Sequence, residues 1–153
     1  MTDMPPSKSK ILIADDNAAN VELLEAYLCD IDCNVVIATD GQETLEQVVL
    51  HRPDLILLDV MMPKLSGFEI CEKLKGDPET SRIMILMVTA LNELGDIERA
   101  VQAGTDDMLS KPINKLELVM RVEKMLRLRH VTDEVERLRR YIEEMEDVGG
   151  PAR

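Results

Sequence analysis

Residues Leu55–Leu58 are four consecutive large apolar residues, and a single carboxylate, Asp59, follows them directly. Asp54 precedes the run and Pro63 closes the segment behind it, so the apolar stretch is short and clearly bounded. A short apolar run without alternation is typical of a strand buried on both faces, as strands of parallel sheets are. A carboxylate at the end of such a strand is costly to bury, so we expect Asp59 to use its charge.

Further short apolar runs alternate with segments whose apolar residues recur at helical spacing. Besides Leu55–Leu58, the predicted strands are Lys10–Ala14, Asn34–Ala38, Ile83–Val88 and Asp107–Ser110. The predicted helices contain Val21, Leu24, Tyr27, Leu28 and Ile31; Leu45, Val48 and Val49; Phe68, Cys71 and Leu74; Leu94, Ile97, Ala100, Val101 and Gly104; and a long stretch from about Asn114. This alternation is typical of βαβ units with right-handed crossovers. We therefore predict an α/β fold with a five-stranded, parallel, doubly wound sheet, flavodoxin-like in its strand order 2-1-3-4-5.

The composition indicates a globular protein rather than a disordered one, since 45% of the 153 residues are hydrophobic and 31% are charged. The formal net charge is −12, which opposes phosphate backbones, so we expect no direct nucleic-acid binding. The start of the chain does not resemble a signal peptide and no run is long enough to cross a bilayer, so we expect a cytoplasmic protein without membrane contact. Cys29, Cys33 and Cys71 are accordingly predicted to be reduced thiols.

Polar side chains follow four of the five predicted strands. Asp15 and Asp16 come after the first strand, Asp59 after the third, Thr89 after the fourth and Lys111 after the fifth. Taken singly, each is an ordinary turn, cap or surface residue. Because the carboxyl ends of parallel strands meet at the edge where such folds bind ligands, we expect these five side chains to lie together.

The chemistry that suits this set is phosphoryl transfer. Three neighbouring carboxylates repel one another unless a cation lies among them. Oxygen ligands favour a hard ion, and a site with room for water and phosphate favours Mg²⁺. A carboxylate beside Mg²⁺ can attack phosphorus while the metal neutralises charge on the phosphoryl oxygens. In this interpretation Asp59 is the phosphoryl acceptor, and Lys111 and Thr89 contact phosphoryl oxygens.

These motifs resemble the response-regulator receiver domains of two-component signalling. The resemblance covers about residues 9–128 and depends on the segments ILIADD, LILLDVMMPKLSGFEIC, VTA and DDMLSKP. The DDNxxNxxLLE pattern and the long last helix resemble in particular the N-terminal receiver of diguanylate-cyclase regulators. The resemblance implies that a sensor histidine kinase or a phosphotransfer protein supplies the phosphoryl group. It also implies a signalling domain that catalyses only its own phosphorylation and dephosphorylation.

Further residue roles follow from the resemblance alone. It implies that Asp16 and Asp59 bind Mg²⁺ directly, that Asp15 acts through water, and that the Met61 backbone carbonyl completes the protein ligands. Lys111-Pro112 matches the position at which the family has a cis peptide bond.

The resemblance also predicts a conformational switch that involves Thr89. The family usually has an aromatic residue three positions before the lysine, and its rotamer follows the phosphorylated state. Here that position is Met108, whose flexible apolar side chain can also move between buried and exposed rotamers. Phosphorylation is expected to shift the face formed by the fourth and fifth strands and their helices.

The last helix carries a regular apolar pattern beyond the predicted receiver domain. Its apolar residues alternate in spacings of three and four, and we call them the seam: Leu128, Val131, Val135, Leu138, Ile142 and Met145. This is the a/d pattern of a coiled coil. With Leu128, Val135 and Ile142 at a and Leu138 and Met145 among the d residues, it favours a parallel homodimer, across which Glu134 at g could pair with Arg139 at e. The alternatives are a single amphipathic helix folded back on its own domain and a charged, solvated linker.

We predict four segments: a disordered tail over 1–8, a receiver domain over 9–127, a coiled-coil helix over 128–148 and a C-terminal tail over 149–153. Gly149-Gly150-Pro151 is expected to stop the helix. Because the helix begins on the face formed by the fourth and fifth strands, a shift of that face is expected to control dimerisation or a fused or separate effector. A first alternative function is an Mg²⁺-dependent phosphohydrolase with an aspartate nucleophile, although such enzymes commonly carry a second acid where this chain has Met61. A second is an inert dimerisation scaffold, against which the complete set of five site residues argues.

Overall fold

The structure is a computed structural model that describes residues 8–90 and 94–149. Its elements alternate along the chain: β1 Ser9–Ala14, α1 Ala18–Leu28, β2 Cys33–Ala38, α2 Gly41–His51, β3 Leu55–Leu58, α3 Gly67–Gly76, β4 Met84–Thr89, α4 Leu94–Ala103, β5 Asp107–Ser110 and α5 Lys115–Gly149. The strands form one parallel sheet in the order β2-β1-β3-β4-β5. The predicted five-stranded, doubly wound α/β fold is therefore confirmed. Most of the two predicted tails, residues 1–7 and 150–153, lies outside the described residues.

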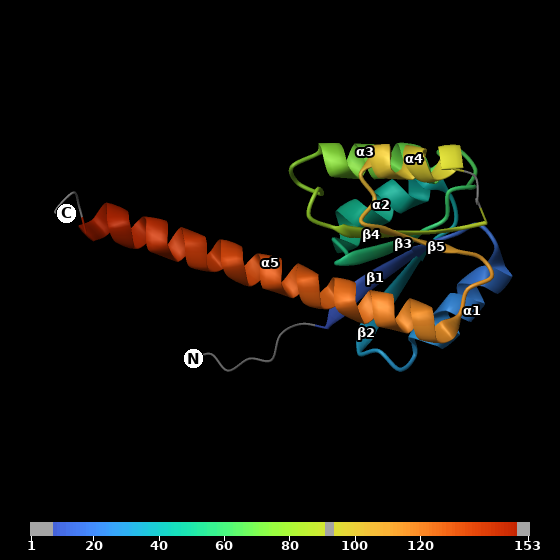
Figure 1. The fold of residues 1–153 in the computed structure, drawn as a ribbon, viewed down its shortest axis with the longest axis horizontal. Helices are drawn as coiled ribbons and strands as arrows, with labels where there is room; N and C mark the ends of the chain where they lie inside the picture. Colours follow the sequence, from blue (N-terminus) through green and yellow to red (C-terminus); the bar gives the residue numbers. More distant parts are fainter. Residues whose placement is uncertain (1–7, 91–93, 150–153) are drawn as a thin grey trace.

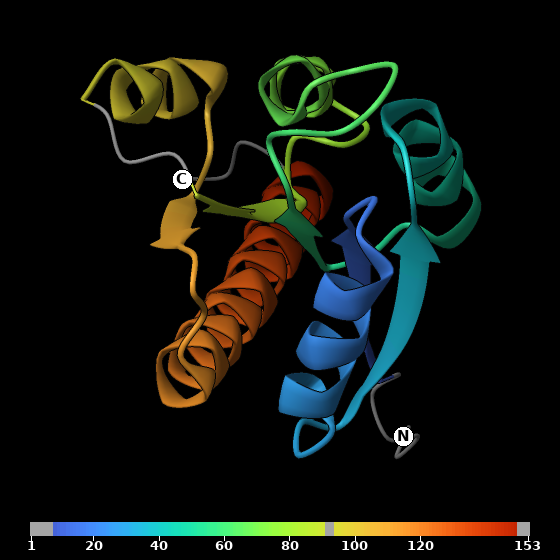
Figure 2. The same cartoon turned by 90° about the vertical axis from the view of Figure 1, so that its right-hand side faces the viewer.

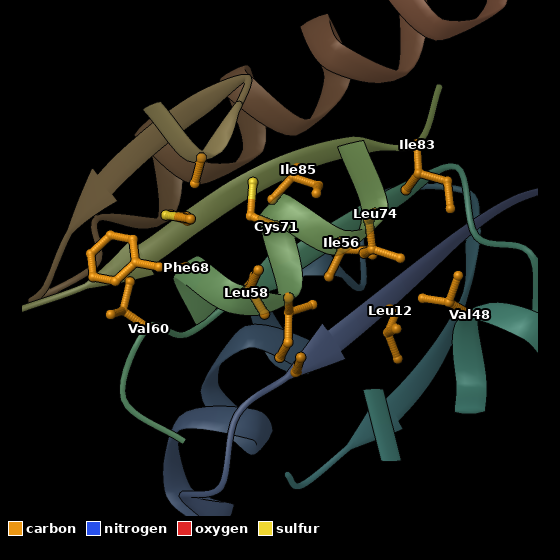
Figure 3. Packing of buried hydrophobic residues seen from close by; sticks show 14 of the residues in the cluster. Leu12, Val48, Ile56, Leu58, Val60, Phe68, Cys71, Leu74, Ile83 and Ile85 are labelled. Carbon is orange, nitrogen blue, oxygen red and sulfur yellow. The ribbon is translucent and has the colours of Figure 1, made fainter. Parts of the chain in front are cut away.

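Helices cover both faces of the sheet, α1 and α5 on one side and α2, α3 and α4 on the other (Figures 1 and 2). Alternate residues of each central strand enter opposite cores, so that Leu12 and Ile56 pack toward α2 and α3 while Ile11 and Leu55 pack toward α1 and α5. Figure 3 shows the first of these cores, in which Phe68 of α3 packs among strand side chains. This two-sided burial explains why the strands read as continuous apolar runs.

Side chains cap the first turns of four helices that begin close to the carboxyl edge of the sheet. The side chain of Asn17 accepts from Asn20 N at 3.1 Å, and that of Asp40 accepts from Glu43 N at 2.7 Å. Ser66 forms a capping box at the start of α3. Before α5, the side chain of Asn114 accepts from Glu117 N at 3.0 Å. These caps satisfy N–H groups that a helix start leaves unpaired, so they fix the loops of this edge.

The observed elements differ from the predicted ones in several places. β1 and β2 each begin one residue earlier than predicted, at Ser9 and Cys33. α4 ends at Ala103, so Gly104, with a φ of 94°, follows the helix instead of lying in it. α1 ends at Leu28, so Ile31 lies in the following loop, although it still packs against the α1 and α5 core. β4 runs from Met84 to Thr89, one residue later than predicted at each end. Val49 lies in α2 as predicted but is 73% exposed, because its neighbour Val48 takes the core-facing position.

The last helix, α5, has 35 residues and is therefore about 50 Å long. Its first turns pack on the sheet through Leu118, Val122, Met125 and Leu126, and the remainder extends away from the sheet (Figure 1). All six seam residues are about half exposed or more, from 48% for Leu128 to 62% for Leu138. No described helix is both long and apolar enough to cross a membrane.

The extended part of α5 is tied to the domain through Arg82, which lies just before β4. Nη1 of Arg82 lies 3.9 Å from Asp133 Oδ1, and its Nη2 pairs with Glu136. Arg129 pairs with Asp133 along the helix. With Leu128 at position a, these three helix residues occupy positions b and f, on the side away from the seam. The helix thus contacts its own domain by its polar side, and among the described residues the seam does not fold back on the domain.

Candidate functional site

Three carboxylates meet at the carboxyl edge of the sheet, beyond β1 and β3. Asp15 and Asp59 are buried, with exposed fractions of 2% and 7%, and Asp16 is exposed. One oxygen atom of each of the three lies within 4.8 Å of the others. Backbone hydrogen bonds to neighbouring strand ends hold the two buried residues, from Asp15 N to Ala38 O at 3.0 Å and from Asp59 N to Ala14 O at 2.9 Å. The structure thus brings the three predicted acidic residues together.

Backbone amides and one lysine orient the two buried carboxylates. Asp15 Oδ1 accepts from Asn17 N at 2.9 Å, and Asp59 Oδ1 accepts from Met61 N at 3.1 Å. Their other oxygens face Lys111, whose Nζ lies 3.2 Å from Asp59 Oδ2 and 3.6 Å from Asp15 Oδ2. One ammonium group therefore faces two carboxylates, and the exposed Asp16 adds a third negative charge.

The surroundings of Asp59 disfavour its ionised form. Burial raises the pKa of the Asp59 carboxyl, and the negative charge of Asp15 raises it further, against the lowering effects of the Met61 N–H and of Lys111. A cation among the three carboxylates would favour their ionised forms. The donor set is entirely oxygen and carries excess negative charge, which suits a hard divalent ion such as Mg²⁺.

The remaining predicted residues lie around this cluster on β4, β5 and the loops that follow β3 and β5. Thr89 ends β4 and is buried, and its carbonyl accepts from Lys111 N at 2.9 Å. The Lys111-Pro112 peptide bond is cis. Met61 is 68% exposed, whereas Met108 is partly buried against the core below α2, α3 and α4. Met108 therefore occupies an inward position in this structure.

Gly67, which lies against the backbone of the acceptor residue Asp59, was not identified from the sequence. A β-carbon at this position would lie 2.6 Å from the Asp59 carbonyl oxygen and 2.7 Å from Val60 Cα. Gly67 N also donates to Val60 O at 2.8 Å, which closes the loop between β3 and α3. The available signal was a glycine directly after the Ser66 cap, a place where closely approaching backbones require it.

Comparison with known proteins identifies the family. The model of the response regulator receiver domain matches residues 11–123, so the chain belongs to this family. The predicted receiver-domain resemblance is confirmed. The response regulator PleD of Caulobacter vibrioides is 43% identical over 127 residues, which are 83% of this chain and 28% of PleD. The chain thus spans less than a third of that relative.

Two solved receiver domains illustrate the structural likeness. The signal receiver domain of a histidine kinase from Syntrophus aciditrophicus is 32% identical, with a TM-score of 0.73 over 77% of this chain and 89% of that one. The receiver domain of the sensor histidine kinase PA1611 from Pseudomonas aeruginosa PAO1 is 29% identical, with a TM-score of 0.72 over 78% and 98%. That second domain was solved with a magnesium ion coordinated in its active site cleft.

Proposed function

We propose that this chain is a phosphorylation-controlled signalling domain that accepts a phosphoryl group on Asp59. The observation that carries the proposal is the position of Asp59, a buried carboxylate between two other carboxylates and the Lys111 ammonium. A sensor histidine kinase or a phosphotransfer protein would donate the group, as the family membership suggests. In the proposed reaction an Asp59 oxygen attacks phosphorus, an O–P bond forms, and the P–N bond of the donor phosphohistidine breaks. The electron pair of that bond leaves with the imidazole.

The surrounding residues have separate roles in this proposal. The carboxylates of Asp15, Asp16 and Asp59 and the Met61 carbonyl would hold Mg²⁺, which when bound neutralises charge on the phosphoryl oxygens. Lys111 already faces the Asp59 carboxylate and would pair with a phosphoryl oxygen after transfer. Because Asp59 is buried, bulk water cannot readily reach it from the side of the sheet.

The phosphoryl group would act on the domain through β4 and α5. The Thr89 hydroxyl would donate a hydrogen bond to a phosphoryl oxygen, and Met108 on the neighbouring β5 would move with Thr89. This shifts a two-state equilibrium of the β4 and β5 face. The long helix α5 packs against β3 and β4 through Leu118 and Val122, so the shift would change how two seams meet in a parallel homodimer.

The proposal is tested by intact-mass spectrometry after incubation with acetyl phosphate. We expect one added phosphoryl group that requires Mg²⁺ and is absent from Asp59→Asn. Asp32→Asn is the matched control, because it removes an exposed carboxylate far along the chain from the acceptor and should be phosphorylated like the wild type. Phosphate release is measured in the same samples. Sustained phosphate release without an adduct would favour the phosphohydrolase alternative. The absence of both an adduct and phosphate release would contradict the proposed acceptor role.

A further inference from the structure

The loop between β3 and α3, residues 59–66, contains a strained turn centred on Lys64. Leu65 N donates to Pro63 O at 2.9 Å, and Lys64 between them has a φ of 73°. A hydrogen bond between residues two apart with a positive φ at the centre defines the rare hand of the γ-turn. A residue with a β-carbon is disfavoured in this conformation, where glycine is usual. Such strain persists only when the surroundings hold it.

The start of α2 supplies the groups that hold this turn. Gly41 N donates to Pro63 O at 3.1 Å, and Lys64 Nζ lies 3.3 Å from Asp40 Oδ2. A β-carbon at Gly41 would lie 2.5 Å from Leu65 Cβ, so the loop and the helix start are packed without space between them. The turn is therefore fixed to α2 by a backbone hydrogen bond, an ion pair and close packing.

Asp40 joins the two segments with a single side chain. One of its oxygens accepts from Glu43 N at 2.7 Å and so caps α2, while the other faces Lys64. The hydrogen bond from Glu43 and the nearby Lys64 ammonium both hold the pKa of the Asp40 carboxyl below its ordinary value. Asp40 is the less exposed partner, with 20% of its side chain accessible against 58% for Lys64.

The same loop carries Met61, three residues before Lys64. The backbone N–H of Met61 donates to the acceptor carboxylate of Asp59. The hydrogen bond from Gly67 N to Val60 O joins the two ends of this loop. We propose that Asp40 and Lys64 are positioning residues: their ion pair holds the γ-turn, and through it the Met61 carbonyl, where a bound Mg²⁺ requires it. This inference rests on the proposed function, because it assumes that the site binds Mg²⁺.

The variant Lys64→Gly distinguishes the positioning role of the ion pair from two other effects that the same substitution has. Glycine accepts a φ of 73° readily, so relief of strain alone would raise the melting temperature. Removal of a positive charge makes the region more negative, so electrostatics alone would strengthen Mg²⁺ binding. Neither of these two effects weakens Mg²⁺ binding, whereas loss of the ion pair that holds the turn does. We expect the dissociation constant for Mg²⁺, from amide chemical shifts, to rise about threefold, the scale of a partly exposed ion pair.

Three further variants sharpen the test. Lys8→Gly removes a lysine from an exposed ion pair with Asp32 and should leave the constant unchanged. Lys64→Arg retains the charge and should bind Mg²⁺ nearly as well as the wild type. Asp40→Asn keeps a capping oxygen but loses the charge, and combining it with Lys64→Gly should weaken binding no more than the stronger single change.

The outcomes distinguish this inference from the proposed function. Mg²⁺ binding by Lys64→Gly that equals or exceeds wild-type binding would overturn the positioning role while the metal site stands. Additive effects of Asp40→Asn and Lys64→Gly would also overturn it, because the two residues would then act separately. A wild-type protein whose amide shifts do not respond to Mg²⁺ would overturn the metal site itself, and the inference with it.

Discussion

Arg82 forms an ion pair with Glu136 that joins the segment before β4 to the extended part of α5. Asp133, almost one helical turn earlier, lies on the same side of the helix. The strand that follows Arg82 ends at Thr89 in the candidate site. One six-residue strand thus connects a residue at the site with the contact that holds the helix.

The first prediction concerns the apolar seam. Val135→Asp places a charge at an a position, where the two copies would meet in a parallel dimer, and should weaken dimerisation at least about 100-fold. Arg137→Asp alters an exposed residue outside the seam and is the control. Sedimentation velocity at matched concentrations gives the result. A wild-type protein that stays monomeric, or equal effects of both variants, would contradict the predicted dimer.

The second prediction concerns Arg82. Arg82→Ala should release the extended part of α5 and speed amide hydrogen exchange around Asp133 and Glu136, while exchange in β1 stays unchanged. The cost in overall stability should be only about 0.5–1 kcal/mol, because the ion pairs are partly exposed. Arg52→Ala, which removes a weaker contact with Glu79, is the control. Unchanged exchange in the helix would show that the contact does not hold it.

The third prediction follows from the raised pKa of Asp59. In the folded protein without metal the ionised form is disfavoured, so the wild type loses stability as the pH rises from the unfolded pKa of 3.8 through the folded value. Asp59→Asn removes that charge and should melt at a higher temperature than the wild type at pH 7 in EDTA, with no difference below pH 3.8.

Magnesium should reverse that order. Binding stabilises the folded state by mass action, so Mg²⁺ should raise the melting temperature of the wild type and leave Asp59→Asn nearly unchanged. Thermal unfolding followed by circular dichroism, with and without Mg²⁺, measures both effects. A variant that melts below the wild type in EDTA at pH 7 would mean that the Lys111 ion pair outweighs the burial of Asp59.

The fourth prediction compares two glycines of α3. Gly67→Ala forces a β-carbon against the Asp59 and Val60 backbone and should cost about 2–3 kcal/mol or more in the free energy of unfolding. Gly76→Ala meets no atom within 4 Å and should stabilise the protein by about 0.5–1 kcal/mol. Urea unfolding gives both values. Similar effects of the two substitutions would contradict the close packing at Gly67.

The fifth prediction orders the three thiols. Burial raises the pKa of Cys71 to about 11, so only about one thousandth of it is thiolate at pH 8. Burial, together with the charge of Asp32, also raises the pKa of Cys33, whereas Cys29 is exposed. Iodoacetamide should therefore modify Cys29 first and Cys71 last, as peptide mapping can show. The order should disappear in guanidinium chloride, and rapid labelling of native Cys71 would contradict a closed core.

The elements of the fold were predictable because burial imposes a recognisable pattern on each: apolar residues at helical spacing in the helices, and short continuous apolar runs in the strands. The residues at the strand ends were predictable as a cluster for a similar reason, since parallel strands bring their carboxyl ends to one edge. Arg82 was not predictable, because its partners are about fifty residues away in sequence and its own surroundings carry no pattern. Lys64 gave no signal either, since a γ-turn with positive φ is expected at glycine or asparagine rather than at lysine.

Helix α5 contains neither glycine nor proline before Gly149, and it runs without interruption from the sheet to the seam. Each residue of a helix rotates the side-chain direction by about 100° around the axis. The two steps from Leu126, which is buried against the sheet, to Leu128 therefore fix the direction in which the seam faces relative to the sheet. Inserting one residue between them would rotate the seam by about 100°, whereas inserting seven would nearly restore its direction. In the proposed dimer, the direction in which the second molecule binds is therefore set by the number of residues between the sheet-packed part of α5 and the seam.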